Sequence, residues 1–253
     1  MRVAVAGGTG VVGTHTVGAL ERSGHVPIVL TRSRGIDLQT GAGLDSALAG
    51  VDALIDVTNF RPNDPAATRT MFETATRHLL DAEARAKVRH HVLLSIVGVD
   101  RMEGNAHYAG KRAQEQLVLA GAVPFTIVRA TQFHDFPAMI VGRVRNGDVA
   151  VVPPLLLQPI AVNEVGSILA EVATAPPMGR RIEIAGPEPQ DFVDMARRTL
   201  AARGTSLRLV PSWRNGVFGV EAAGEVLLPG ADARLAPTTF DAWLEEEKRR
   251  PRG

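Results

Sequence analysis

Short apolar runs alternate with amphipathic segments along the first half of the chain. Runs such as Val3–Ala6 and His91–Ile96 are largely apolar, which is typical of strands buried on both faces of a parallel sheet. The segments between them place Ala, Leu and Val at helical spacing and end at glycines such as Gly24 and Gly121. This alternation predicts an α/β fold in which a parallel sheet carries helices on both faces. The predicted strands are Val3–Ala6, His25–Leu30, Ile36–Leu38, Ala53–Val57, His91–Ile96 and Phe125–Arg129, and the predicted helices are Val11–Ser23, Leu44–Ala49, Pro65–Ala86 and Ala106–Ala120.

The pattern changes after the last of these strands. Proline and glycine become frequent, in pairs such as Pro153-Pro154, Pro176-Pro177 and Gly186-Pro187, and the regular alternation loosens. We therefore predict a core over residues 1–130 and a smaller, substrate-binding region over residues 131–253. The two are expected to interleave as a single structural unit.

The first predicted strand runs directly into a glycine-rich turn. Gly7, Gly10 and Gly13 are spaced three residues apart, and a helical pattern begins at Val11. In such a turn the first glycine allows a sharp bend, the second lets the backbone approach a pyrophosphate, and the third permits close packing of helix on strand. Backbone N–H groups at the helix start then face the phosphates. The turn predicts an NAD(P)-binding, Rossmann-type doubly wound sheet. Its predicted cofactor-binding residues are Gly7, Thr9, Gly10, Val11, Val12 and Gly13.

The residues after the second strand bear on which dinucleotide binds. An acidic side chain about twenty residues past the glycine turn would hold the ribose hydroxyls of NAD. The chain has Thr31-Arg32-Ser33-Arg34 there, without a carboxylate. Because Arg32 can pair with a 2′-phosphate and Ser33 can donate a further hydrogen bond, we predict that NADP(H) is preferred over NAD(H). Asp37-Leu38 and Thr58-Asn59 follow two later strands and are predicted to neighbour the adenine and ribose.

Composition excludes several kinds of chemistry. The 253 residues include no cysteine, which rules out disulfides, thiolate metal sites and cysteine nucleophiles and fits a reducing cytoplasm. Lys and Arg, 28 in all, nearly balance the 27 Asp and Glu, and the basic cluster Lys248-Arg249-Arg250 with Arg252 directly follows three glutamates. We interpret that cluster as a solvated helix end and tail and expect no nucleic-acid partner.

The apolar segments are all short. None approaches the roughly 20 residues needed to cross a bilayer, and the chain starts within a strand. We therefore expect a cytoplasmic protein with no signal peptide and no membrane contact. An oligomer is possible, although no heptad run or exposed apolar helix indicates one.

Several motifs occur in the order typical of one family. The glycine turn and Arg32 are followed by Ser95–Asp100 after a strand and by Lys111 on the next helix. With Arg129–Phe133 and Gln158–Val162, the chain resembles an atypical short-chain dehydrogenase/reductase of the NmrA-like kind over most of its length. The resemblance implies NAD(P) binding and assigns Lys111 to the nicotinamide ribose. Such proteins include NADPH-dependent reductases and also NADP-binding regulators without turnover, so the fold alone does not assign a reaction.

The sequence departs from this family's pattern at the proton donor. Short-chain dehydrogenases use Tyr-x-x-x-Lys, in which the phenol and the ammonium share one helix face. Four residues before Lys111 this chain has His107, and Tyr108 stands three before it. The unperturbed pKa of histidine, about 6.5, lies nearer neutral pH than that of tyrosine, about 10. His107 is therefore a candidate acid or base, Tyr108 replaces it if the helix is rotated, and Ser95 either binds a substrate oxygen or simply closes its strand.

Other polar and aromatic residues carry weaker signals. His90 and His91 point to opposite faces of a strand, and no histidine is paired with carboxylates at metal-ligand spacing, so we predict no metal site. Gln132 and Phe133 follow the last strand and are predicted to contact the substrate, with a buried core aromatic as the alternative for Phe133.

Two functions fit these residues. The first is an NADPH-dependent oxidoreductase of the short-chain dehydrogenase/reductase type, acting on a small apolar or aromatic carbonyl, quinone or activated double bond. The second is an NADP-binding protein without redox turnover, either a redox sensor or regulator or a cyclase, dehydratase or isomerase on the same scaffold. The histidine at the expected tyrosine position motivates the second. We favour the first, because many hydride transfers to quinones or activated double bonds need no tyrosine acid.

Overall fold

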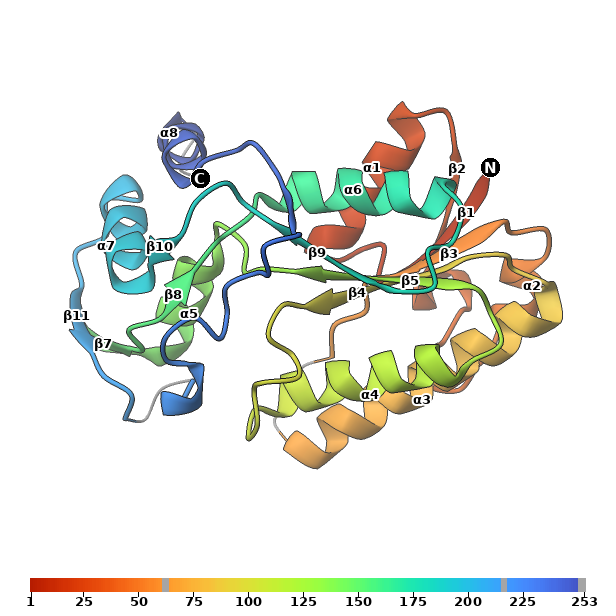
Figure 1. Ribbon diagram of the computed structural model, residues 1–253, viewed down its shortest axis with the longest axis horizontal. Coiled ribbons are helices and arrows are strands. Elements are labelled where there is room, and N and C mark those ends of the chain that lie inside the picture. The colour runs from red at the N-terminus through yellow and green to blue at the C-terminus, as the bar shows by residue number, and fades with distance from the viewer. Residues whose placement is uncertain (61–63, 215–217, 250–253) are drawn as a thin grey trace. The chain divides into compact units, whose positions relative to one another are not determined.

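A computed structural model of the protein describes residues 1–60, 64–214 and 218–249, and it contains the predicted alternation of strands and helices (Figure 1). Arg250 and Arg252 of the predicted basic tail lie outside the described residues. The helices are α1 (Val11–Arg22), α2 (Leu44–Leu48), α3 (Pro65–Ala86), α4 (Ala106–Ala120), α5 (Phe136–Val144), α6 (Val162–Thr174), α7 (Phe192–Ala202) and α8 (Phe240–Arg249). The strands are β1 (Arg2–Ala6), β2 (Val26–Leu30), β3 (Ala53–Asp56), β4 (His91–Ile96), β5 (Phe125–Ala130), β6 (Arg145–Asn146), β7 (Val149–Val152), β8 (Leu156–Leu157), β9 (Arg181–Ala185), β10 (Gln190–Asp191), β11 (Arg208–Pro211) and β12 (Arg234–Leu235). Two 3₁₀ turns, η1 (Arg32–Arg34) and η2 (Val220–Ala222), complete the elements.

Seven strands form the main sheet, in the order β12-β9-β5-β4-β3-β1-β2. β1 lies between β2 and β3 and pairs in parallel with both, and β3 pairs in parallel with β4. All four residues of β3 and the last four of β1 are buried, because helices cover both faces of these central strands. The predicted Rossmann-type α/β fold is confirmed.

The chain folds as two compact units. The first comprises residues 1–129 and 162–182, and the second comprises the described parts of 130–161 and 183–253. The first unit therefore contains α6, which follows a long stretch of the second unit in the sequence.

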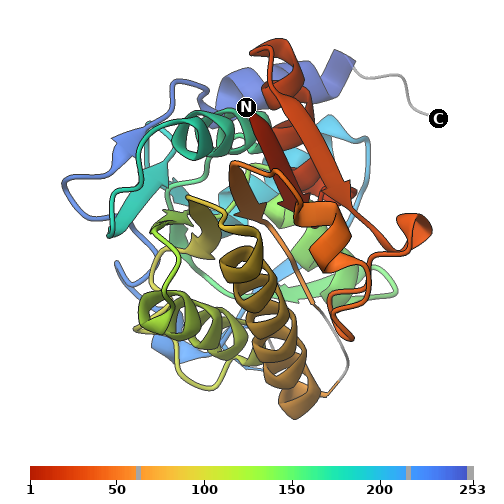
Figure 2. The same ribbon diagram turned by 90° about the vertical axis from the view of Figure 1, so that its right-hand side faces the viewer.

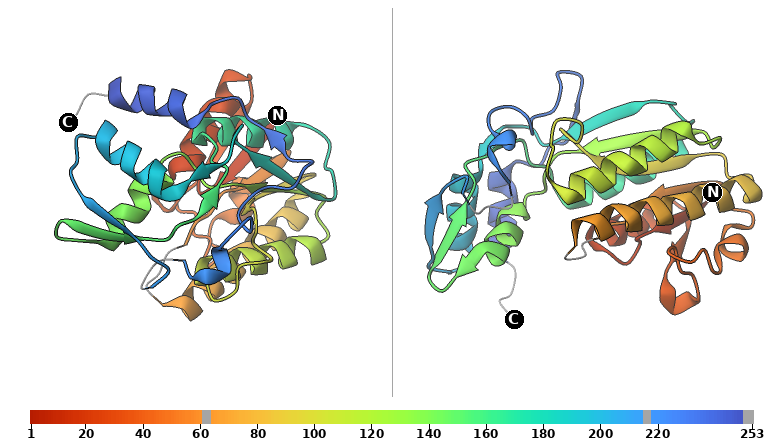
Figure 3. Two further views of the ribbon diagram at one scale, coloured as in Figure 1. Left: turned by 60° about the vertical axis from the view of Figure 1, so that its left-hand side comes forward. Right: turned by 90° about the horizontal axis from the view of Figure 1, so that it is seen from below.

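In the first unit, α1 and α6 lie side by side on one face of the sheet, and α3 and α4 lie side by side on the other (Figures 1 and 2). Figure 3 shows the α3–α4 pair from below. Glycines allow both pairs to approach closely. A Cβ atom on Gly166 of α6 would lie 2.8 Å from the backbone of His15, and one on Gly110 of α4 would lie 2.2 Å from the Phe72 ring of α3. Small residues at these points set the helix spacing.

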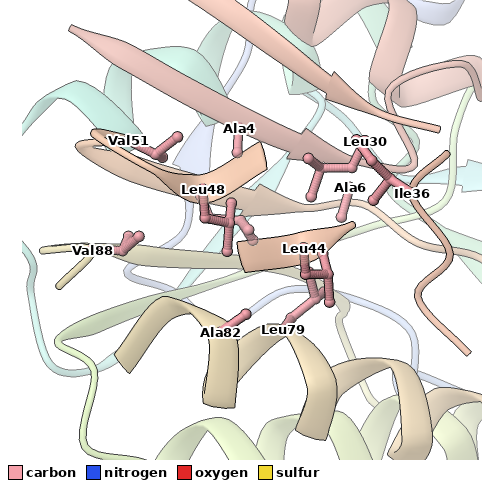
Figure 4. Packing of buried hydrophobic residues seen from close by; sticks show 11 residues of the cluster. Ala4, Ala6, Leu30, Ile36, Leu44, Leu48, Val51, Leu79, Ala82 and Val88 are labelled. Atoms are coloured by element: carbon pink, nitrogen blue, oxygen red, sulfur yellow. The ribbon is translucent and has the colours of Figure 1, made fainter. Parts of the chain in front are cut away.

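A cluster of aliphatic side chains fills the space between α2, α3 and the sheet (Figure 4). Leu44 and Leu48 of α2 and Leu79 of α3 are buried there in one cluster with Ala4 of β1 and Leu30 of β2. Each such leucine stabilises the fold by roughly 1.5–3 kcal/mol relative to an exposed one. This packing holds β1 and the turn that follows it.

The predicted strand at Ile36–Leu38 is wrong. These residues follow the 3₁₀ turn η1 and lie outside every strand. The Asp37 carboxylate accepts a hydrogen bond from the Gln39 N–H at 2.8 Å, and the Asp37 carbonyl accepts one from Gly41 at 2.8 Å. Gly41 has a φ of +76°, in the left-handed region. Local turn bonds of this kind compete with strand pairing, so Asp37 and Leu38 do not end a strand as we predicted.

In its described residues the second unit contains short strands, the helices α5, α7 and α8, and an aromatic cluster. β7 pairs in parallel with β11 and antiparallel with β6, and β10 pairs antiparallel with β8. The Phe136 ring of α5 contacts Phe192 and Phe218 at centroid distances of 5.6 and 5.9 Å. Across both units, none of the helices in the described residues is both long and apolar enough to span a membrane.

Candidate cofactor and active site

The glycine turn after β1 has the geometry that its sequence predicts. Gly7 adopts a φ of +81°, and a Cβ atom there would lie 2.8 Å from the Val57 carbonyl oxygen. A Cβ atom on Gly13 would lie 2.1 Å from the Gly7 carbonyl oxygen, so only glycine allows α1 to pack this closely on the turn. Gly10 is the N-cap residue of α1, and its N–H donates a hydrogen bond to the Gly7 carbonyl oxygen at 2.9 Å.

The start of α1 is open to an anion. The N-cap Gly10 provides no side-chain acceptor, and the first turn contains no acidic residue. The N–H groups of a first helical turn have no partners within the helix, and the helix dipole favours negative charge there. Val11 is 62% exposed and Thr9 is exposed, so nothing in the turn itself covers these donors. The turn therefore fits a dinucleotide pyrophosphate.

Arg32 and Ser33 lie in η1, directly after β2, and their side chains are exposed. The hydroxyls of Ser33 and Thr31 are 3.3 Å apart. Within the described part of the chain, neither Arg32 nor the neighbouring Arg34 forms an ion pair. Both guanidinium groups can therefore bind an added phosphate.

Lys111 of α4 is almost completely buried. Its Nζ donates to the carbonyl oxygens of Thr58 and Leu94, both at 3.0 Å, and lies 5.1 Å from the centroid of the Phe72 ring. Thr58 lies just beyond the carboxyl end of β3, and Leu94 lies in the second half of the adjacent strand β4. Burial lowers the pKa of Lys111 to about 8, against the opposing effect of the Asp56 and Glu115 carboxylates.

A buried polar network lies beside Lys111, and our sequence reasoning missed it. The Asp56 carboxylate accepts hydrogen bonds from the Thr58 N–H at 2.8 Å and from Gln114 Nε2 at 3.0 Å. Gln114 Nε2 also contacts the hydroxyls of Thr58 at 3.3 Å and Thr76 at 3.0 Å. Two signals were available: Asp56 is the only charged residue of an apolar strand, and Gln114 follows Lys111 by three residues, on the same helix face.

His107 and Tyr108 stand in the first turn of α4. The side chain of the N-cap residue Asn105 accepts hydrogen bonds from the N–H groups of both, at 3.0 and 3.2 Å. Tyr108 is buried and His107 is half-buried. The His107 ring lies 5.6 Å from Phe72, the ring that also faces Lys111, and 6.4 Å from the Tyr108 ring. His107 and Lys111 therefore share one aromatic neighbour, and Tyr108 lies next to that pair.

Ser95 is placed where an added ligand would complete its hydrogen bonding. It follows Leu94, whose carbonyl holds Lys111, and it is 2% exposed. In the described residues its Oγ has no hydrogen-bond partner. Buried hydroxyls are nearly always paired, so this atom fits a cofactor or substrate group. Thr58 is also buried, whereas Asn59 beside it is exposed.

A second set of charges anchors α4 to the sheet. Glu115 accepts a two-pronged hydrogen bond from Arg129 at 2.8 and 2.6 Å and a further one from Arg181 at 2.7 Å. Arg129 also pairs with Asp100 of the β4–α4 loop at 2.7 Å. The negative charge of Glu115 is thus balanced by two arginines.

His90, just before β4, and His91, its first residue, point apart, as predicted. His90 bonds the Ala175 carbonyl at 3.2 Å and the Thr126 hydroxyl at 2.9 Å, whereas His91 bonds Glu83 of α3 at 2.8 Å. The described residues contain no group of three His, Cys, Asp or Glu side chains placed to hold a metal ion.

Gln132 and Phe133 belong to the second unit. Gln132 is buried, and Phe133 is half-buried and forms a parallel bridge with Ile160. The next residue, His134, bonds the Thr238 carbonyl at 3.1 Å, and burial lowers its pKa to about 4. A substrate contact for Gln132 and Phe133 stays a prediction.

Comparisons with known proteins agree with this geometry. A family model described as NAD(P)H-binding matches residues 7–176. No curated protein matches the chain with significance. A solved short-chain dehydrogenase/reductase superfamily protein from Agrobacterium tumefaciens with bound NAD is 21% identical, with a TM-score of 0.70, over 98% of this chain and 96% of that one.

Two further solved structures are similar at lower identity. An NADPH-dependent quinone oxidoreductase from Escherichia coli is 16% identical, with a TM-score of 0.73, over 96% of this chain and 98% of that one. A nucleoside-diphosphate-sugar epimerase from Staphylococcus aureus is 17% identical, with a TM-score of 0.73, over 97% of this chain and all 100% of that one. These structures agree in fold with the resemblance inferred from the motifs, and the family model covers more than half of the chain. The chain therefore belongs to the NAD(P)H-binding family, with the fold of the short-chain dehydrogenase/reductase superfamily.

Proposed function

We propose that the protein is an NADPH-dependent oxidoreductase that reduces a small apolar or aromatic carbonyl, quinone or activated double bond. One observation carries the proposal. The uncapped glycine turn after β1 and the buried ammonium of Lys111, held by carbonyls just after β3 and in the second half of β4, lie toward the carboxyl side of three adjacent strands. Ligands of open α/β sheets bind at this carboxyl edge.

Different residues of the site hold different parts of the cofactor, which supplies a hydride when it is bound. The first turn of α1 binds the pyrophosphate through backbone N–H groups, and Arg32 with Ser33 binds the 2′-phosphate. Lys111 has three N–H donors, of which two are engaged by the Thr58 and Leu94 carbonyls. The third is available to the hydroxyls of the nicotinamide ribose.

Ser95 and His107 act on the substrate. The Ser95 hydroxyl, which lacks a partner in the described residues, donates to the substrate oxygen and so completes its own hydrogen bonding. His107, four residues before Lys111 on α4, delivers the proton that this oxygen gains as the carbon accepts the hydride. Tyr108 is the second candidate for the proton, since it is the only tyrosine of the chain and lies beside His107.

A second function has a specific observation in its favour. Histidine replaces the tyrosine of the Tyr-x-x-x-Lys pattern, which fits a protein that binds NADP without net turnover or that uses the scaffold for an isomerisation or elimination. The names of the similar structures do not separate the two, because one is a quinone oxidoreductase and another is an epimerase.

Titration of the purified protein with NADPH, NADH, NADP⁺ and NAD⁺ tests the cofactor first. The absorbance of reduced nicotinamide is then followed with a panel of quinones, enals and ketones. We expect NADPH to bind most tightly and to be oxidised with at least one acceptor. Tight binding without oxidation by any acceptor would favour the second function, and no binding of any nucleotide would refute both.

Single substitutions then test the roles. Ser95→Ala should lower kcat/KM about tenfold or more, whereas Ser167→Ala, an exposed serine on α6, should leave it unchanged. His107→Gln should lower kcat about 100-fold with little change in NADPH affinity, because a general acid acts only in the chemical step. If Tyr108→Phe has the larger effect on kcat instead, the proton comes from the phenol.

A further inference from the structure

Asp56 places a carboxylate in the interior of the sheet. It is completely buried at the end of β3 and receives its two hydrogen bonds from Thr58 and Gln114. Neither donor is charged. In the described residues Asp56 takes part in no ion pair within 4.0 Å, yet a buried carboxylate requires a compensating positive charge.

Lys111 is a buried cation on which the Asp56 carboxylate acts, and the two residues are joined through Thr58. Two carboxylates act on the Lys111 ammonium, Asp56 from β3 and Glu115 from α4 itself. From the other elements around it, Lys111 meets the Phe72 ring of α3 and the Leu94 carbonyl of β4, which carry no net charge. Glu115 is already balanced by two arginines, so Asp56 is the carboxylate left for Lys111.

Asp56 has weaker charged neighbours as well. Its carboxylate acts electrostatically on the buried Glu83–His91 pair, which joins α3 to β4. The Glu83 carboxylate contacts His91 Nδ1 at 2.8 and 3.0 Å, and His91 Nε2 has no hydrogen-bond partner in the described residues, so neither residue bonds Asp56 directly.

We propose that Asp56, fixed by Gln114, is a positioning residue that holds Lys111 in place and balances its charge. Asp56 orients Thr58 through the Thr58 N–H, and the Thr58 carbonyl in turn holds Lys111 Nζ. Gln114 ties Asp56, the Thr58 hydroxyl and Thr76 together. This inference rests on the proposed role of Lys111 at the cofactor, but its first test needs no cofactor.

The consequence is a defined response to pH. Burial favours the neutral amine of Lys111, and the Asp56 carboxylate opposes it by favouring the ammonium. Removing the charge of Asp56 lowers the pKa of Lys111 further, so the ammonium is lost at a lower pH. Any cofactor affinity that depends on this ammonium then falls earlier as the pH rises.

The lysine content of the chain makes a direct measurement possible. The sequence contains three lysines, and Lys87 and Lys248 are both exposed. In protein labelled with ¹³C and ¹⁵N at lysine, NMR titration follows three side chains, and Lys111→Met assigns the Lys111 signal. We expect Lys111 to titrate at a lower pH than the other two and Asp56→Asn to lower its midpoint further. Thr76→Val removes one hydrogen bond of Gln114 without a charge and should leave the midpoint in place. An unchanged midpoint in Asp56→Asn would overturn the proposal.

A double-mutant cycle covers the case in which Asp56→Asn alone folds poorly. Asp56→Asn, Lys111→Met and the double variant are compared by thermal unfolding. Each single variant leaves one buried charge unbalanced, whereas the double variant removes both charges. The double variant should therefore lose less stability than the sum of the single losses. Additive losses, or a double variant that does not fold, would contradict the proposed coupling.

Cofactor binding supplies the functional readout. Between about pH 6.5 and about pH 8.5, the NADPH affinity of Asp56→Asn should fall several-fold more than that of wild type, by the amount that the shift of the NMR midpoint sets, because each pKa unit corresponds to a factor of about ten. If the NMR midpoint moves but NADPH does not bind to either protein, the positioning role stands and the proposed function fails. If NADPH binds with the same pH dependence in both, the positioning role fails and the proposed function stands.

Discussion

The glycine turn after β1 and the cluster around Lys111 lie at the same edge of the sheet. The turn depends on backbone geometry, whereas the cluster depends on side chains. The turn uses backbone geometry, because Gly7 and Gly13 leave no room for a Cβ atom and the first turn of α1 carries no acidic side chain. The Lys111 cluster uses buried polar side chains, with Asp56 and Gln114 at its centre. The turn is therefore sensitive to added volume at any pH, whereas the cluster is sensitive to the loss of charge and to pH.

The buried polar side chains around Lys111 are followed, deeper in the protein, by the pair Glu83 and His91. Breaking this pair should cause the largest loss of stability. Both side chains are fully buried, and His91 Nδ1 lies 2.8 Å from Glu83 Oε1. Glu83→Ala leaves His91 without its partner and should lower the free energy of unfolding by about 4 kcal/mol, the usual cost of breaking a buried pair. Urea unfolding measures the loss. Glu73→Ala on the same helix breaks only the exposed pair with Arg69 and should cost less than about 0.5 kcal/mol.

The pH dependence of this loss has a definite sign. Burial alone would lower the pKa of His91, but the Glu83 carboxylate against it raises the pKa above its usual value. A raised pKa in the folded state stabilises the protein fully below about pH 6.5, the ordinary value for histidine, and this contribution disappears as the pH rises through the folded pKa. The difference in free energy of unfolding between wild type and Glu83→Ala should therefore become smaller at alkaline pH. A difference that widens with pH would show that the protonated histidine is not the stabilising form.

The glycine turn is tested by a substitution that adds side-chain volume. Gly13→Ala places a Cβ atom 2.1 Å from the Gly7 carbonyl, and the backbone must move to relieve the contact. We expect a loss of about 3 kcal/mol in unfolding free energy, at the upper end for overpacking, together with a loss of NADPH binding at all pH values. Gly18→Ala is the control on the same helix. Its Cβ meets only the flexible end of Arg22 at 3.2 Å, so helix propensity should stabilise the protein by about 0.5–1 kcal/mol. Equal effects of the two substitutions would contradict a specific role for Gly13.

The same difference explains what the sequence revealed. The turn was predictable because Gly7 and Gly13 act on each other within one short segment, as do the helix and strand periodicities that gave the correct elements around them. Asp56 and Gln114 lie 58 residues apart, and only the packing of α4 on the sheet brings them together. The wrong strand at Ile36–Leu38 has a local cause, since turn bonds of the Asp37 side chain outweigh the apolar residues beside it.

Several short strands after β5 depend on distant partners as well, although β6 and β7 form a local hairpin. β7 pairs with β11, and β12 pairs with β9, and each of these strands is only two to five residues long. Predicting them requires the pairing partner, which lies far away in the chain. The helix register of His107 and Lys111, by contrast, was readable from their spacing, and the shared contact with Phe72 agrees with it.

Arg32 combines features of the two regions, because it places a charged side chain near a turn whose other predicted cofactor contacts come from the backbone. Its guanidinium is exposed in η1 and has no ion-pair partner in the described chain. Arg32→Ala should therefore cost little stability but weaken NADPH binding by about 2 kcal/mol, the value of a charge-assisted hydrogen bond. NADH lacks the 2′-phosphate, so its affinity should barely change.

Arg34→Ala provides the comparison for Arg32→Ala, since both residues are exposed in the same 3₁₀ turn. Isothermal titration of both variants with NADPH and NADH, at low and at raised salt, separates a specific contact from a general field. A specific phosphate contact makes the Arg32 effect larger than the Arg34 effect and preserves part of it in salt, because directed hydrogen bonds are screened less than distant charges. Equal losses for NADPH and NADH in Arg32→Ala would remove the argument for NADP(H).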